Sequence, residues 1–267
     1  MAAGPDSGSI LNTPLFSPEQ RASLRSGLLQ YGEADLRIGG TAITGSAAAE
    51  REDRWSDIDL AFAVTDPADL PNVLADWTAH MYEQHQALHH CDVRAGAWIY
   101  RVFLLPDTLQ VDLAFVPAAE FRALTPAFRL VSGRANEPRH APPPVLEEII
   151  GLGWLYALHA RSSIARGNFW QAEYMISGVR DHALALASIR HGLPAAHGRG
   201  IDRLPSEVTA PFEGSLVPRL EADEIARAFQ VAIAGLLREI ECVDPALAVR
   251  LDATLRSLGD TSRHARR

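Results

Sequence analysis

Residues 36–64 read LRIGGTAITGSAAAEREDRWSDIDLAFAV, and this stretch decides the fold of the N-terminal half. Residues 36–44 are mostly apolar and lead into a Gly-Ser pair, whereas residues 57–64 alternate between acidic or small and large apolar side chains. A period of two is typical of a β-strand that buries one face. We therefore expect two strands here, separated by a turn and a polar loop.

Two carboxylates stand at the start of the second strand. Asp57 and Asp59 are two residues apart, so they share one face, while Ile58 and the large apolar residues after it share the other. Adjacent carboxylates repel each other and raise each other's pKa unless a cation lies between them. Such an oxygen-lined site suits Mg²⁺, which binds one or two carboxylates, water and substrate phosphates. The alternative is a solvated strand edge.

A third carboxylate lies on a later strand, over residues 109–116. Asp112 alternates there with Val111 and Leu113, so it belongs to the polar face of a half-buried strand. Three carboxylates on neighbouring strands predict a two-metal centre, or one metal and a base, for displacement at phosphorus. A surface carboxylate beside a hairpin is the alternative for Asp112.

The Gly45-Ser46 pair stands upstream of Asp57, where the first strand ends. Gly45 permits a tight turn, and Ser46 is suited to cap a short helix that continues to about residue 53. A helix N-terminus approached through glycine and carrying a hydroxyl is a candidate phosphate site. Ser46 as a helix cap alone is the alternative, and capping does not exclude phosphate binding.

The remaining pattern predicts an α+β chain: an N-terminal mixed sheet of four or five strands with flanking helices, followed by a C-terminal helical bundle. The first domain is expected over 17–132, with a helix over 18–31 that Ser17 and Gln20 cap and Gly32 ends, a helix over 66–87, and a hairpin of strands over 98–105 and 109–116. Residues 133–144 hold four prolines and predict a stiff linker. The helical domain is expected over 145–259, with helices over 145–166, 169–191, 221–242 and 246–258. Residues 1–16 and 260–267 are expected to be disordered.

Composition excludes several function classes. All 25 basic residues of the 267-residue chain are arginine, so Lys-dependent chemistry, such as a Walker P-loop, a protein-kinase site or Schiff-base catalysis, is excluded. The net charge of −8 argues against a nucleic-acid partner. Most of the acidic excess lies in residues 1–144, which hold 11 arginines and 18 acids.

Cysteine content and hydropathy bear on location. Cys91 and Cys242 are the only cysteines, which predicts no disulfide framework and fits a reducing compartment. The longest apolar stretch, residues 149–158, is about half of the ~20 residues needed to cross a bilayer. We expect a cytoplasmic protein with no membrane partner. The sequence leaves the oligomeric state open, a homodimer included.

The combination of Gly45-Ser46, Asp57-Ile58-Asp59 and a later lone Asp112 resembles the signature of the nucleotidyltransferase superfamily, which has the DNA polymerase β-like fold. Within it, the chain looks most like the small enzymes that adenylylate aminoglycoside or lincosamide antibiotics. The resemblance covers residues 36–116 by motif and residues 145–257 by helical character alone. It implies transfer of a nucleoside monophosphate, AMP from ATP, to a hydroxyl of a small molecule, with Mg²⁺ as cofactor. It also implies that the helical domain completes the acceptor pocket.

The resemblance also implies roles for single residues. Asp57 and Asp59 would hold Mg²⁺ and the triphosphate, Asp112 would be a third ligand or a base, and Gly45 and Ser46 would bind phosphate oxygens.

The chain departs from the family at one point. Antibiotic-modifying members often have Arg-Gly soon after the Gly-Ser pair, whereas this chain has Ala49-Glu50. We expect Arg51, Arg54 or Arg101 to take the place of that arginine.

The acceptor side depends on the helix over 169–191. Glu173, Ser177 and Arg180 share one stripe of this helix. In kanamycin-type relatives a Glu of the helical domain deprotonates the acceptor hydroxyl, and Glu173 is the candidate here. A structural ion pair between Glu173 and Arg180 is the alternative. Two other functions stay open: a nucleotidyltransferase that acts on tRNA or protein, and a catalytically idle nucleotide-binding module.

Overall fold

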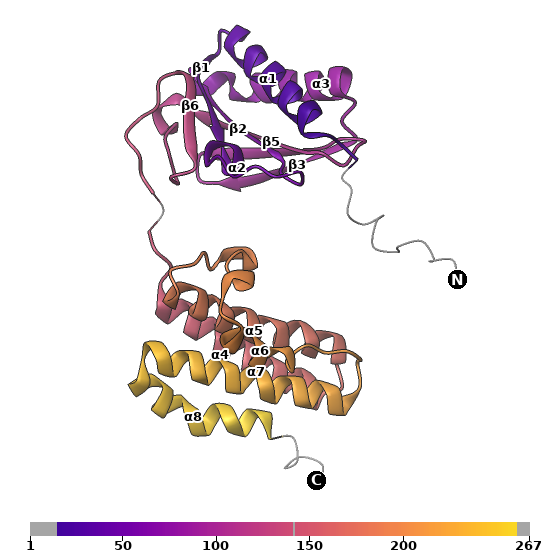
Figure 1. The fold of residues 1–267 in the computed structure, drawn as a ribbon, viewed down its shortest axis with the longest axis vertical. Coiled ribbons are helices and arrows are strands. Elements are labelled where there is room, and N and C mark those ends of the chain that lie inside the picture. The colour runs from indigo at the N-terminus through magenta and orange to yellow at the C-terminus, as the bar shows by residue number, and fades with distance from the viewer. Residues whose placement is uncertain (1–14, 141, 261–267) are drawn as a thin grey trace, which may run out of the picture. The chain divides into compact units, whose positions relative to one another are not determined.

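The computed structural model describes residues 15–140 and 142–260. The chain divides into two compact units, Met1–Pro142 and Pro143–Arg267, and Figure 1 shows a sheet with helices in the first and a helical region in the second. The predicted disordered ends lie almost wholly outside the described residues. Phe16, which falls within the predicted N-terminal one, is described and is buried in the core of the first unit.

The first unit is built on a six-stranded mixed sheet. Its strands are β1 (Ile38–Thr44), β2 (Ile58–Val64), β3 (His89–Ala95), β4 (Trp98–Leu104), β5 (Gln110–Pro117) and β6 (Phe128–Gly133), in the order β3-β4-β5-β2-β1-β6. β2 and β5 run parallel, and the other neighbouring pairs are antiparallel. The α+β fold class predicted from the sequence is confirmed. The parallel pair at the centre brings the two acidic strands together.

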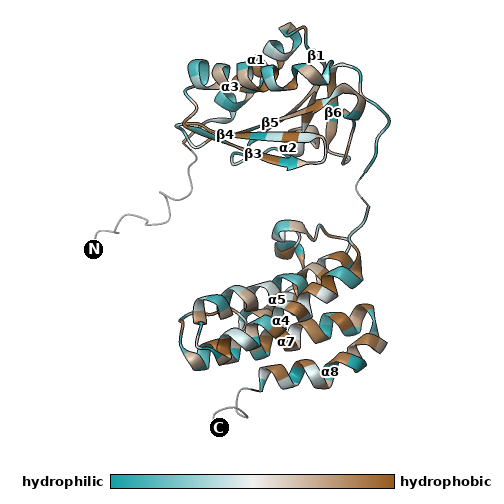
Figure 2. Ribbon diagram, turned by 180° about the vertical axis from the view of Figure 1, so that it is seen from behind, coloured by the Kyte–Doolittle hydropathy of each residue, from teal (hydrophilic) through white to brown (hydrophobic). Residues whose placement is uncertain are grey.

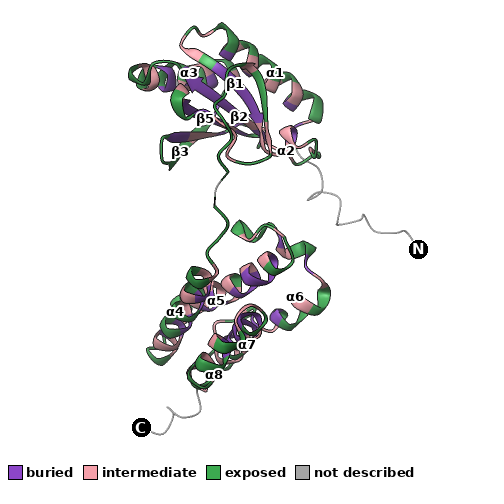
Figure 3. Ribbon diagram, turned by 90° about the vertical axis from the view of Figure 1, so that its left-hand side faces the viewer, coloured by how far each residue is buried: buried purple, intermediate pink, exposed green. Residues whose placement is uncertain are grey.

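Two helices, α1 (Pro18–Ala34) and α3 (Leu70–His85), cover one face of this sheet. The predicted capping box starts α1: the Gln20 amide donates to Ser17 Oγ, and the Ser17 amide donates to Gln20 Oε1. The large side chains of β2 and β5 pack here against α3, with ring centroids 4.4 Å apart for Phe62 and Trp77. Figure 3 shows the central strands as buried and much of the surface of α1 and α3 as exposed.

The opposite face of the sheet is lined by small side chains. Ala42, Ala61, Ala63 and Ala114 are buried there beside Trp98, Val116 and Phe121. The segment after β5, which includes the 3-10 helix η3 (Ala118–Glu120), packs against this second cluster through Phe121 and Leu124. This alanine-lined face ends at the carboxylates described below.

The sheet has more strands than the four or five predicted, because both edges were missed. β3 reads HHCDVRA and is largely exposed, so it lacks the apolar alternation that identifies a half-buried strand. It is held instead by its antiparallel pairing with β4. β6 is likewise an exposed edge strand, paired only with β1 in the described sheet. Edge strands need backbone pairing more than a buried face, so composition alone does not identify them.

Three predicted helix boundaries are wrong. Gly32 does not end α1 but lies buried inside it against the Phe62 ring, where an added Cβ would come within 2.7 Å of the ring. The helix expected over 66–87 is divided into a 3-10 turn, η2 (Pro67–Asp69), and α3. The helix expected from Ser46 to about residue 53 is only four residues long, α2 (Gly45–Ala48).

The proline-rich segment is partly tied to the sheet unit. The Asn136 amide donates to the Phe121 carbonyl (2.8 Å), and the Arg139 amide donates to the Ala123 carbonyl (3.0 Å). Residues 134–139 therefore lie alongside residues 121–123. Three of the four prolines come after this stretch, at 142–144.

The second unit is helical. It contains α4 (Leu146–Ala165), α5 (Phe169–Arg190), α6 (Ser206–Glu213), α7 (Ala222–Val243) and α8 (Pro245–Gly259), with two 3-10 turns, η4 (Ala196–Gly198) and η5 (Ile201–Arg203). The four long helices match the predicted ones to within two residues at each end. No helix was predicted between residues 191 and 221, where α6 lies; Pro205 directly precedes α6 and Pro211 lies inside it.

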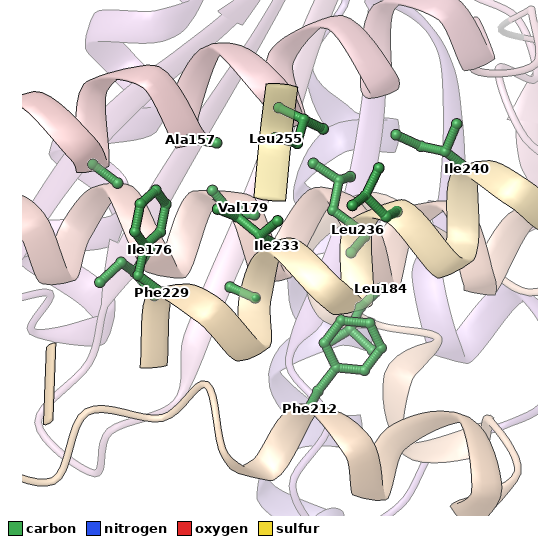
Figure 4. Packing of buried hydrophobic residues seen from close by; sticks show 14 of the residues in the cluster. Ala157, Ile176, Val179, Leu184, Phe212, Phe229, Ile233, Leu236, Ile240 and Leu255 are labelled. Carbon is green, nitrogen blue, oxygen red and sulfur yellow. The ribbon is translucent and has the colours of Figure 1, made fainter. Parts of the chain in front are cut away.

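The helical core is shared by α4, α5 and α7 and completed by α6 and α8. Figure 4 shows Ile176, Val179 and Phe229 packed side by side, with Phe212 of α6 at the other end of the cluster. In Figure 2 these helices carry both hydrophobic and hydrophilic residues along their length, as helices that bury one face do. None of the helices in residues 15–140 and 142–260 is both long enough and apolar enough to cross a membrane.

Candidate functional site

Asp59 and Asp112 lie side by side at one end of the alanine-lined face. They are register partners in the parallel pairing of β2 with β5. Partners in a pleated sheet point to the same face, and the residues two places on, Ala61 and Ala114, are buried in the alanine-lined cluster. Asp57 comes two residues before Asp59, directly ahead of β2.

Asp112 is held in an environment that disfavours its charge. Burial and, second, the negative charge of Asp57 raise the pKa of Asp112 to about 6. Its Oδ1 is buried and has no hydrogen-bond partner among the described residues. A buried polar atom without a partner is unusual in a folded protein and calls for a functional explanation, such as a ligand or an ion. Asp57 and Asp112 therefore belong to one electrostatic group.

Gln110 is a member of this group that the sequence did not reveal. Its Nε2 donates a hydrogen bond to Asp57 Oδ2 at 3.2 Å. Gln110 comes two residues before Asp112 on β5, which places both side chains on the same face. The period of two along β5 was the available signal.

Gly45 packs directly against Asp59. Its φ is +62°, and a Cβ at this position would lie 1.9 Å from Asp59 Oδ2. Both the backbone conformation and the lack of space require glycine. The turn after β1 is thereby brought into contact with the carboxylates of β2.

Ser46 does not cap a helix. The N-cap of α2 is Thr44, and Ser46 lies inside this four-residue helix. A helix this short gives no support to the predicted anion site at a helix N-terminus. The Ser46 hydroxyl is nevertheless buried and finds no hydrogen-bond partner in the part of the chain that the structure describes. It is the second buried, unpaired oxygen beside the carboxylates, after Asp112 Oδ1.

Two of the three candidate arginines are on the loop over residues 49–57, between α2 and β2. The Arg51 amide donates to the Ser46 carbonyl at 2.9 Å, which joins the loop to the turn. The Arg54 guanidinium lies over the Trp55 ring, 4.8 Å from its centroid. Both arginines are exposed.

Arg101 is on the other face of the sheet. Its register partner on β5 is Leu113, whose side chain is buried under the helices. It donates to both carboxylate oxygens of Asp92 (2.7 and 2.8 Å) and to Thr78 Oγ1 of α3 (2.6 Å). The prediction placed Arg101 on the correct strand, but a step of one residue turned it away from the carboxylates. Arg101 joins β3 and β4 to α3 and is not brought to the site.

Tyr100, the neighbour of Arg101, takes the place on the carboxylate face. Its register partner is Ala114, and its ring stacks on Trp98 with centroids 5.9 Å apart. Burial and the charge of Asp112 both raise the pKa of the Tyr100 hydroxyl. Tyr100 therefore borders the site on its β4 side.

Glu173 belongs to the helical unit. Ser177 Oγ donates to Glu173 Oε1 at 2.7 Å, one turn along α5. Arg180 takes other partners: it donates to the Ser215 carbonyl at 3.3 Å and lies 3.6 Å from Asp181 Oδ1. The structural ion pair between Glu173 and Arg180 is thus not the arrangement observed.

The helical unit also contains a cavity of about 490 Å³. It lies between the start of α4, the middle of α5 and the segment over residues 195–201, with Ile149, Asp181, His182 and His197 in its lining. Nδ1 of His182 donates to the Gly178 carbonyl at 2.7 Å, because a carbonyl oxygen can only accept. The size is that of a small-molecule site.

The donor set beside Gly45 fits Mg²⁺ in its chemistry. Three carboxylates stand at one end of one sheet face, and carboxylate oxygens are the protein ligands that Mg²⁺ prefers. The unpaired Oδ1 of Asp112 gives this fit a structural basis. Across residues 15–140 and 142–260, no group of three or more His, Cys, Asp or Glu side chains is placed so that it could hold a metal ion.

Comparisons with known proteins find a likeness among solved structures. No protein-family model matches the chain, and no curated protein matches it. Among solved structures, the chain is similar to an aminoglycoside 6-adenyltransferase from Bacillus subtilis, at 12% sequence identity and a TM-score of 0.40. The alignment covers 92% of this chain and all of the other.

Proposed function

We propose that this chain is a Mg²⁺-dependent nucleotidyltransferase that moves a nucleoside monophosphate, AMP from ATP, to a hydroxyl of a small molecule. The observation that carries the proposal is the pairing of Asp59 with Asp112 on parallel strands, with the Gly45 turn in contact with Asp59. Carboxylates beside a turn with an unpaired hydroxyl suit a nucleoside triphosphate and its cation.

The triphosphate is assigned to the β1 side of the carboxylates. Ser46 offers its unpaired hydroxyl to a phosphate oxygen, and Gly45 lets the phosphate approach the backbone. Arg51 and Arg54 stand on the adjoining exposed loop, where long cationic side chains can reach an anionic ligand. Asp57 and Asp59 would hold Mg²⁺, with Asp112 as a third ligand or as the base. When bound, Mg²⁺ would neutralise the triphosphate and stabilise the pyrophosphate leaving group.

The acceptor is assigned to the β5 and β4 side. Its hydroxyl oxygen attacks the α-phosphorus, the bond from that phosphorus to pyrophosphate breaks, and the hydroxyl proton passes to a carboxylate. Asp112 is the candidate base if Asp57 and Asp59 alone hold Mg²⁺: without a metal its pKa is raised to about 6, and a base works best when its pKa lies near the working pH. Glu173 is the second candidate for the base.

The acceptor class is proposed to be cationic, as aminoglycosides and lincosamides are. The sheet unit supports this through its excess of acids, 18 against 11 arginines in residues 1–144.

A pyrophosphate-release screen tests the proposal. The full chain is assayed with Mg²⁺, each nucleoside triphosphate, and a panel of aminoglycosides, lincosamides and other hydroxyl compounds. We expect release with at least one cationic acceptor, loss of release in Asp57→Ala, and retention in the control Asp76→Asn, whose side chain is an exposed partner of Arg37. Full activity in Asp57→Ala would overturn the mechanism.

Two other outcomes would redirect the assignment. Radiolabel from ATP found only in polymer, after incubation with lysate fractions, would favour a tRNA or protein acceptor. Nucleotide binding by calorimetry without pyrophosphate release from any acceptor would favour an idle nucleotide-binding module.

A further inference from the structure

Arg21, in the first turns of α1, is a buried arginine far along the chain from the candidate site. Only 4% of it is exposed. Burying a guanidinium is costly unless its donors are bonded, and an apolar residue often serves stability as well or better. A buried arginine at the start of a surface helix therefore calls for an explanation other than packing.

The guanidinium of Arg21 binds residues 52–56 of the loop that precedes Asp57. Nη1 donates to two backbone carbonyls, those of Asp53 (2.7 Å) and Ser56 (2.8 Å). Nε lies 3.2 Å from Glu52 Oε1, and Arg25 of the next turn of α1 pairs with the same oxygen. Arg21 thus holds the loop by two hydrogen bonds to its backbone and one ion pair with Glu52, although Nε itself makes no hydrogen bond in the described residues.

The same loop is closed on itself. The Asp53 amide donates to Ser56 Oγ (2.9 Å), and the Trp55 amide donates to Asp53 Oδ1 (2.8 Å). Residues 53–56 form one compact turn, and Arg21 fastens both of its ends to α1.

The hydrogen bond from Arg21 to the Ser56 carbonyl also restrains the backbone of Asp57. The Ser56 carbonyl and the Asp57 amide belong to one planar peptide unit, so a bond that fixes the carbonyl fixes the whole plane. This plane ends at the Cα of Asp57, so it fixes the point from which the Asp57 side chain starts. Asp57 is also the carboxylate whose charge acts on Asp112 and whose oxygen accepts from Gln110.

We propose that Arg21 is a positioning residue. It fixes the Ser56–Asp57 peptide plane and thereby keeps the Asp57 carboxylate in its place near Asp112. This inference rests on the proposed function. It adds to the site a residue of α1 that touches neither the nucleotide nor the acceptor.

Kinetics of three variants test this role. In Arg21→Met we expect kcat to fall about 100-fold, as a misplacement of roughly 1 Å produces, with the acceptor KM changed less than threefold. Arg21→Lys keeps a donor and restores at least a tenth of the wild-type kcat. Arg37→Met is the matched control. It removes the hydrogen bonds of another arginine, to Asp35 and Asp76, and should keep the wild-type kcat.

Two readouts do not need turnover. Hydrogen exchange in Arg21→Met speeds up over residues 52–58 and stays unchanged over β4 and β5. Calorimetric titration with Mn²⁺ alone shows weaker binding in Arg21→Met than in Arg37→Met. If the wild-type chain releases no pyrophosphate, the proposed function fails, and these two readouts still decide the role of Arg21.

The opposite results would overturn the inference. They are a wild-type kcat in Arg21→Met, or equal losses of kcat in Arg21→Met and Arg37→Met that follow their melting temperatures. Unchanged exchange over residues 52–58 would overturn it as well. If Arg21→Met does not fold, Arg21→Lys is decisive: its kcat must be lower than that of the wild type, and its hydrogen exchange over residues 52–58 must be faster.

Discussion

The two faces of the sheet differ in what their side chains do. Under α1 and α3, the strands present large residues such as Phe62 and Phe115, which pack against Trp77. On the other face, the same strands present alanines that end at carboxylates. Burying aromatic rings contributes stability, whereas small side chains and a charged end leave room for a ligand at a cost in stability. A step of one residue along a strand moves from one role to the other.

Among substitutions on the carboxylate face, Asp59→Asn should cause the largest loss of activity. Asp59→Asn keeps the shape of the side chain but removes a charge that the proposed reaction needs, so we expect pyrophosphate release to fall by about 10³-fold or more. The melting temperature should stay within a few degrees of the wild type. A variant that keeps its activity would separate this face from the chemistry.

The next effect is a loss of stability on the helix-covered face. Phe62 is fully buried against Trp77, so Phe62→Ala should lower the free energy of unfolding by about 3–5 kcal/mol, as measured by denaturant titration. Ala61→Gly, on the other face of the same strand, is the control and should cost about 1 kcal/mol. Equal losses in the two variants would contradict the division of roles.

Gly45→Ala tests the contact between the turn and the carboxylates. An added Cβ meets Asp59 Oδ2 and is strained at a φ of +62°, so we expect about a 100-fold loss of activity and a cost of about 1–3 kcal/mol. Gly96→Ala is a matched control: it also has a positive φ (+59°), and its Cβ would enter open space. Similar activity losses in both would show that strain alone is responsible.

Asp112 should make stability depend on pH. Its pKa is about 6 in the folded chain against 3.8 for an unperturbed aspartate, so the protonated form favours folding. Its contribution is fully present below about pH 4 and is lost as the pH rises through 6. In metal-free buffer we therefore expect Asp112→Asn to be about 1–2 kcal/mol more stable than the wild type at pH 8, and equal to it near pH 4. A pH-independent difference would contradict the raised pKa.

The central strands were predictable because their alternation records which face is buried. The period of two placed Asp57 and Asp59 on one face of their strand and Asp112 on the polar face of its own. That these faces coincide needed the register of β2 against β5. Arg101 shows the limit of this reasoning, because choosing the strand without its register left the face undecided, and the face decides its partner. β3 was missed because an edge strand does not need an apolar stripe.

Other features depend on contacts that no local pattern contains. The Ser46 hydroxyl was expected to cap a helix, but the helix begins one residue earlier, at Gly45, so Ser46 lies inside it and its hydroxyl is left unpaired. Arg21 lies 32 and 35 residues before the carbonyls that it binds, so its role emerges only from the packed fold. The contact of Gln110 with Asp57 could be recognised only from the register of β5 against β2. These are tertiary contacts, set by packing rather than by neighbours in sequence.

A crystal grown with Mn²⁺ and a non-hydrolysable ATP analogue tests the central claim most directly, with the metal located by anomalous scattering. We predict manganese bound by the carboxylates of Asp57, Asp59 and Asp112, and a triphosphate on the turn at Gly45 and Ser46. Manganese and nucleotide found elsewhere on the chain, with these carboxylates unengaged, would contradict the account.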